Sequence, residues 1–192
     1  MLAGQNVKLN NDVTLSGDPL TLDKDVESTV NLNGKAIDNS TSDVFVVTAG
    51  HLTIEGDGKV IASADNSSSA WAVWAKGYGK VPIKGGTYMC GDDESSKASG
   101  NWRNDCIYAR DNATIIIEGG EFMYTGNNPD GHKFLLNVRD GSGAKIVVKG
   151  GTFHNFNPAS TASENPVTSF VAEGFKSVET AVGSNIWEVI PE

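Results

Sequence analysis

The sequence contains little of what builds helical bundles, disulfide scaffolds or basic binding surfaces. Leucine accounts for only 9 of the 192 residues, whereas valine and isoleucine together number 29, so a helix bundle is nearly excluded. The 15 Lys and Arg residues form no cluster and are outnumbered by 24 Asp and Glu, which argues against binding to nucleic acid or to an anionic membrane surface. There is no run of 18 apolar residues, so we expect no membrane-spanning segment.

Two cysteines, Cys90 and Cys106, are too few for a disulfide-stapled scaffold. They flank a polar insert of 15 residues, which leaves two interpretations open: a disulfide, or two buried thiols in neighbouring strands. The first residues, MLAGQNVKLNND, have no charged start and no apolar stretch, so we do not expect a secretory signal there.

The abundant residues favour strands joined by tight turns. The chain has 22 Gly, 17 Asn, 17 Ser and 13 Thr in addition to its Val and Ile. β-Branched side chains fit a pleated sheet, and Gly and Asn tolerate the positive φ values of tight turns. The composition therefore predicts an all-β fold.

An internal repeat is the strongest pattern in the chain. Three Gly-Gly pairs each follow an apolar strand and precede an aromatic residue, in VPIKGGTYM (81–89), TIIIEGGEFMY (114–124) and KIVVKGGTFHNF (145–156), and HLTIEGDGKVIA (51–62) is a looser copy. The steps from Gly85 to Gly119 and from Gly119 to Gly150 are 34 and 31 residues. A period in this range is typical of a stacked array of repeats.

Each repeat has a further strand upstream and a longer polar loop, at 63–70, 91–105 and 126–133. This order predicts a right-handed parallel β-helix, a solenoid with widening coils over residues 1–156, closed by a capping hairpin within residues 157–192 of the same domain. A β-sandwich is the alternative.

By alternation, the predicted inward positions are Val46, Ile54, Val73, Ile83, Ile107, Ile115, Ile117, Leu135, Ile146 and Val148. The predicted corners are Gly85, Gly86, Gly119, Gly120, Gly150 and Gly151, and Phe153, Phe156 and Phe170 are expected to close the C-terminal end of the core.

The C-terminal segment carries a resemblance. GGTFHNFNP (150–158) is followed by SFVAEGFKSVE (169–179) and IWEVIPE (186–192). This order resembles a C-terminal pattern of β-helical repeat proteins found on the surface of gut bacteria and in the phages that infect them, notably in head-fibre and capsid-decoration proteins. The match covers residues 150–192 well and the upstream Gly-Gly repeats more loosely.

The resemblance implies a structural virion protein: a head-fibre or capsid-decoration subunit on the capsid exterior, presenting loops for attachment to host glycans or for assembly. A repeat domain of an extracellular bacterial adhesin is the alternative, and a β-helical polysaccharide lyase or hydrolase is a second one. The family also implies a homotrimer that contacts other capsid or fibre proteins, with host surface polysaccharide as a further partner. We expect no enzymatic activity, no cofactor, and neither nucleic acid nor a membrane as partner.

Acidic residues gather at two places where a polysaccharide-cleaving enzyme would need paired carboxylates or metal ligands. The first, between the cysteines, holds Asp92, Asp93 and Glu94 together with Arg103, Asn104 and Asp105. We interpret it as a solvated loop in which Asp92, Asp93 and Glu94 are weak candidates for Ca²⁺. The second is the pair of turns Arg110-Asp111 and Arg139-Asp140, which predicts a ladder of salt bridges at successive turns. The three histidines, at 51, 132 and 154, are too isolated to predict a zinc site.

Aromatic residues form the candidate contact surface. Trp71 and Trp74 are three positions apart, which predicts that they point to opposite faces of one strand. At least one is therefore expected on the outer surface, where it would bind a sugar ring or a neighbouring subunit. The candidate ligand or partner contacts are Trp71, Trp74, Tyr78, Trp102, Arg103 and Tyr108.

Overall fold

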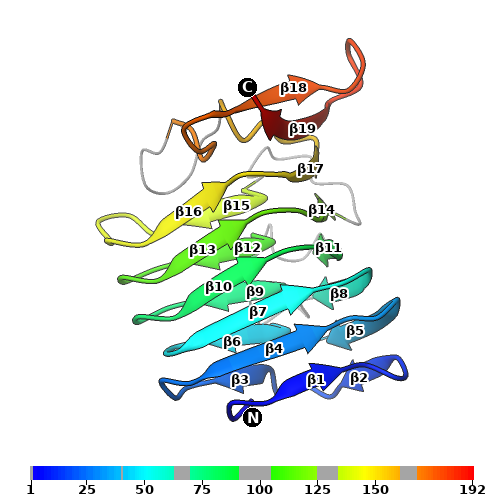
Figure 1. The fold of residues 1–192 in the computed structure, drawn as a ribbon, viewed down its shortest axis with the longest axis vertical. Helices are drawn as coiled ribbons and strands as arrows, with labels where there is room; N and C mark the ends of the chain where they lie inside the picture. Colours follow the sequence, from blue (N-terminus) through cyan, green and yellow to red (C-terminus); the bar gives the residue numbers. More distant parts are fainter. Residues whose placement is uncertain (1, 40, 63–69, 91–104, 125–133, 161–167) are drawn as a thin grey trace, which may run out of the picture.

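In the computed structural model, the described residues are 2–39, 41–62, 70–90, 105–124, 134–160 and 168–192, and these ranges are all-β (Figure 1). They contain no helix that is long and apolar enough to cross a membrane. The strands form three sheets, here named A, B and C.

Each sheet takes every third strand of the chain. Sheet A consists of β1 (Asn6–Lys8), β4 (Glu27–Asn31), β7 (His51–Glu55), β10 (Lys80–Ile83), β13 (Thr114–Ile117) and β16 (Lys145–Val148). Sheet B consists of β2 (Val13–Leu15), β5 (Lys35–Asn39), β8 (Gly58–Ala62), β11 (Thr87–Cys90), β14 (Glu121–Tyr124), β17 (Gly151–His154), β19 (Ile186–Pro191) and β18 (Phe175–Glu179). Sheet C consists of β3 (Leu20–Leu22), β6 (Phe45–Val47), β9 (Val73–Ala75), β12 (Ile107–Ala109) and β15 (Leu136–Val138).

The pairing within the sheets is parallel except at the C-terminus, where β19 pairs antiparallel with both β17 and β18. Parallel pairing of this kind is not that of the antiparallel β-sandwich considered as the alternative. The register widens along the chain: Thr29 in β4 pairs with Thr53 in β7, 24 positions further on. Ile54 then pairs with Ile83, and Ile83 with Ile117, at steps of 29 and 34 positions.

The Gly-Gly pairs lie where the chain passes from sheet A to sheet B. The second glycine of each pair has a positive φ, +93° at Gly86 and +108° at Gly120. Successive repeats approach each other closely there, because the Glu121 backbone N–H donates to the carbonyl oxygen of Gly86 at 2.9 Å. A Cβ on Gly120 would lie 2.9 Å from that same carbonyl oxygen, so both the conformation and the spacing require glycine.

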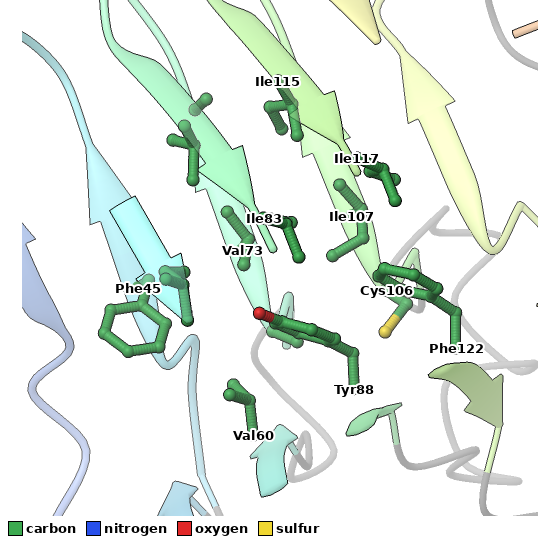
Figure 2. Packing of buried hydrophobic residues seen from close by; sticks show 14 of the residues in the cluster. Phe45, Val60, Val73, Ile83, Tyr88, Cys106, Ile107, Ile115, Ile117 and Phe122 are labelled. Carbon is green, nitrogen blue, oxygen red and sulfur yellow. The ribbon is translucent and has the colours of Figure 1, made fainter. Parts of the chain in front are cut away.

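One continuous hydrophobic core fills the space between the three sheets, and Figure 2 shows part of it, with side chains from all three sheets directed inward. Nine of the ten predicted inward positions belong to this core. Val46 is the exception and the prediction for it was wrong. Its neighbours Phe45 and Val47 point inward, so alternation places Val46 on the outer side of sheet C, where it is nonetheless buried.

A column of aromatic rings runs through the core toward the C-terminus. Tyr88, Phe122 and Phe153 stack on successive strands of sheet B, with both centroid distances 5.0 Å. Phe156 contacts Phe153, and Phe170 contacts Phe156, each at 6.4 Å. All are buried, which confirms that Phe153, Phe156 and Phe170 close this end of the core.

Cys90 and Cys106 are not joined by a disulfide and are completely buried, which is the second of the two interpretations drawn from the sequence. Cys90 ends β11 in sheet B and Cys106 immediately precedes β12 in sheet C, and Figure 2 shows the Cys106 side chain inside the core. Burial raises the pKa of the Cys106 thiol well above its ordinary value, and the adjacent Cys90 thiol raises that pKa further.

Candidate functional site

The outer face of sheet C carries a row of side chains, one from each of four neighbouring strands. In register, Val46 of β6 pairs with Trp74 of β9, which pairs with Tyr108 of β12, which in turn pairs with Asn137 of β15. These strands are only three residues long, and the residues on either side of each point into the core. The central side chain of each strand therefore faces outward.

Three aromatic rings meet on this face, and we name Trp71, Trp74 and Tyr108 the tryptophan cluster. The Trp71 and Trp74 ring centroids are 4.7 Å apart at an angle of 52°, and Trp71 stacks on Tyr108 at 4.9 Å and 14°. Both indoles are half-buried, whereas Tyr108 is only 8% exposed. The prediction that the two tryptophans point to opposite faces was wrong. Trp71 lies before β9 begins at Val73, so the alternation of a strand does not extend to it.

Two cations lie against the Trp74 ring. The Lys76 Nζ is 3.8 Å from the ring centroid and the Arg110 guanidinium carbon is 5.0 Å from it, both within the range of a cation–π interaction. Burial and the charge of Arg110 lower the pKa of Lys76, while Asp43 and Asp111 act in the opposite direction. The Asp111 carboxylate lies 3.5 Å from the Arg110 Nε and accepts a hydrogen bond from the Gly77 backbone N–H at 3.0 Å.

Buried carboxylates lie close to the cluster. Asp43, 6% exposed, accepts a hydrogen bond from the Trp71 backbone N–H at 2.9 Å. Burial raises the pKa of Asp43 to about 6, although the Trp71 N–H and the charge of Lys76 both oppose the shift. Asp105, 3% exposed, accepts a hydrogen bond from the Asn137 side-chain amide at 3.0 Å, and this pair is part of the buried structure next to β12 and β15.

The indole Nε1 atoms of Trp71 and Trp74 are buried and have no hydrogen-bond partner among the described residues. An unpaired buried donor costs about 1–3 kcal/mol.

The other candidate residues lie elsewhere. Tyr78 is 75% exposed in the turn after β9, away from the ring contacts of the cluster. Trp102, Arg103, Asp92, Asp93, Glu94, Asn104 and His132 fall outside the described residues. His154 contacts Glu121 at 2.7 Å on sheet B. Within the described ranges, no group of three or more His, Cys, Asp or Glu residues could hold a metal ion.

The predicted ladder of salt bridges is found only in part. Arg110 and Asp111 form an ion pair, but among the described residues none joins Arg139 to Asp140 or links the two turns. Asp111 has a φ of +62°, and its carboxylate binds the preceding coil through Gly77, so it stabilises the turn.

Asp43, Lys76 and Asn137 are not among the site residues predicted from the sequence. Lys76 could have been found: WAVWAKG (71–77) and CIYARDN (106–112) align so that Trp74 matches Tyr108 and Lys76 matches Arg110, as the observed register has it. Asp43 had no such signal, because its contact with Trp71 depends on how segments 28 positions apart are placed side by side.

Comparisons with protein-family models, with curated proteins and with solved structures found no match to this chain.

Proposed function

We propose that the three sheets are the faces of a right-handed parallel β-helix, a solenoid in which each coil contributes one strand to sheets A, B and C in turn. Two observations support this: every third strand shares a sheet, and parallel register continues from β1 to β16 in sheet A. Each coil then buries its apolar face only by stacking on its neighbours.

On this scaffold we propose a non-enzymatic structural and attachment role as a head-fibre or decoration subunit on the outside of a phage capsid. The observation that carries the proposal is the single core that extends from Leu2 to Val189 through all three sheets, because such a core makes a stiff element. The β18–β19 hairpin lies at the C-terminal end of sheet B, as Figure 1 shows, so the stack ends there in antiparallel pairing.

The contact surface of this subunit would be the outer face of sheet C. Partly exposed aromatic rings at the tryptophan cluster are suited to binding an external partner. In the sequence, the segments 63–69, 91–104 and 125–133 each stand between a strand of sheet B and the next strand of sheet C. Association into a homotrimer is part of the proposal.

The experiment is to purify intact virions of the source phage by density-gradient centrifugation and to quantify this chain by mass spectrometry. We expect it at a fixed copy number relative to the major capsid protein, and sedimentation equilibrium of the isolated protein should give three times the chain mass of 20.3 kDa. Absence from purified virions, together with presence on bacterial cell surfaces, would instead identify a bacterial adhesin.

A further inference from the structure

The geometry points to a binding site for a neutral sugar on the outer surface of sheet C, formed by Trp71, Trp74, Lys76, Arg110 and Asp111. This inference rests on the attachment role proposed above and names the class of ligand that the tryptophan cluster takes. It also places the contact on the sheet itself and not only on the loops.

The apolar part of the site is the pair of indoles. Each of these residues remains partly exposed. The C–H face of a pyranose is apolar, and it packs on an aromatic ring while its hydroxyl groups stay at the rim. The rings are held in place before any ligand arrives: Trp71 stacks on buried Tyr108 and its backbone is bonded to Asp43. Rigid rings lose little conformational entropy on binding.

The polar part of the site suits hydroxyl groups. Lys76 and Arg110 lie over the Trp74 ring and supply donors there, and Asp111, whose side chain is 44% exposed, supplies acceptor oxygens beside Arg110. A sugar hydroxyl both donates and accepts, so it matches a mixture of the two. Because the two cations are balanced by Asp111 and by nearby Asp43, and because the chain carries a net charge of −9, the site has no excess positive charge to bind an acidic polysaccharide.

The size of the exposed apolar surface favours a sugar over a second protein. The remaining residues of the outer row, Val46, Tyr108 and Asn137, are already buried. The two half-buried indoles are a small apolar surface, whereas a stable protein interface buries about 800 Å² per partner. Two adjacent rings instead match one or two sugar units.

Affinity electrophoresis of the full chain tests the inference. Native gels would contain dextran, galactomannan or arabinogalactan as neutral polymers, and alginate as an anionic one. We expect at least one neutral polymer, and not alginate, to retard the wild-type protein. Trp74→Ala should weaken that binding about tenfold or more, which is the effect of losing a central aromatic contact. The matched control is Tyr78→Ala, which removes an exposed aromatic outside the cluster and should bind like the wild type.

Trp74→Ala could fail to fold, so Arg110→Gln is the second variant. It keeps every ring and removes a charged donor from the site, and it should weaken binding several-fold while circular dichroism and the melting temperature stay unchanged.

Retardation by no neutral polymer, retardation by alginate alone, or binding by Trp74→Ala and Arg110→Gln equal to that of the wild type would overturn the inference. A change in oligomeric mass on Trp74→Ala would show that the cluster is a subunit interface and would overturn it too. Incorporation of Arg110→Gln into virions at normal copy number would separate failure of the sugar site from failure of the proposed virion role.

Discussion

The Asp43 carboxylate accepts a hydrogen bond of 2.9 Å from the backbone N–H of Trp71, and this bond joins two segments 28 positions apart at the tryptophan cluster. The hydrogen bond favours the ionised carboxylate, but the residue is only 6% exposed and loses more through desolvation than it gains. Its pKa is therefore about 6 instead of the ordinary 3.8. The native protein holds a proton on Asp43 over a pH range in which the unfolded chain has released it.

This difference predicts that Asp43→Asn stabilises the protein in a pH-dependent way. A pKa raised on folding gives a stability contribution that is fully present below pH 3.8 and is lost as the pH rises through about 6. Asparagine keeps the acceptor for Trp71 and carries no charge, so the variant avoids that loss. We expect its advantage in free energy of unfolding to be small near pH 3.5 and to grow by about 1–3 kcal/mol by pH 7.

Urea denaturation of both proteins between pH 3.5 and pH 7.5 measures this gain. Asp57→Asn is the control, because Asp57 is exposed, and its substitution should shift stability by less than about 0.5 kcal/mol at any pH. A constant difference between Asp43→Asn and the wild type across the range would show that Asp43 does not titrate as described.

The parts of the fold that could be predicted from the sequence are those fixed by local backbone demands. Gly86, Gly120 and Gly151 have positive φ values and lie close to atoms of preceding repeats, so a repeated Gly-Gly marks the same place between sheets A and B each time. Alternation also located most of the core, because it holds inside any strand. It misplaced Val46, since in a three-residue strand a shift of one position exchanges the two faces.

The candidate site was less accessible to sequence reasoning. Trp71 lies outside a strand, so its direction is set by the bend before β9 and not by a two-residue period. The cation pair against Trp74 arises because the residues after β9 and β12 are stacked in register. Such contacts depend on the register between strands of successive repeats. The spacing of the glycines alone does not determine that register.

The aromatic column predicts that Phe122 is a sensitive position of the core. Phe122 is fully buried and stacks on Tyr88 and Phe153 at the same time. Phe122→Ala removes both stacks and leaves a cavity, so it should lower the free energy of unfolding by about 3–5 kcal/mol, and Phe122→Leu by about 1–2 kcal/mol. Guanidinium denaturation measures both values. Tyr78→Leu, at an exposed ring, should change stability by less than about 0.5 kcal/mol, and a loss at Phe122→Ala no larger than this would contradict the importance of the column.

The close approach of coils at the Gly-Gly corners predicts different costs for two glycine substitutions. Gly183, in the turn between β18 and β19, has a φ of +77° with nothing within 4 Å of an added Cβ. Gly183→Ala should therefore cost only the backbone strain, roughly 1–2 kcal/mol. Gly120→Ala adds contact with the Gly86 carbonyl oxygen at 2.9 Å, and we expect about 3 kcal/mol or more. Equal midpoints of thermal or urea unfolding for the two variants would show that the corner relaxes freely.

The buried thiols predict slow chemistry in the native state. Cys90 and Cys106 are both 0% exposed, and burial keeps the Cys106 pKa well above its ordinary value, so little thiolate is present to attack a reagent. A small aromatic disulfide such as DTNB should label both cysteines at once in denaturant but only at the rate of structural opening in native buffer, slower by about a hundredfold or more. Tyr78→Cys provides the matched control, because it adds one thiol at a 75% exposed position that should react immediately while the two native thiols stay protected. Rapid labelling of a thiol in the unmodified native protein would mean that the junction between β11 and β12 opens far more readily than its complete burial implies.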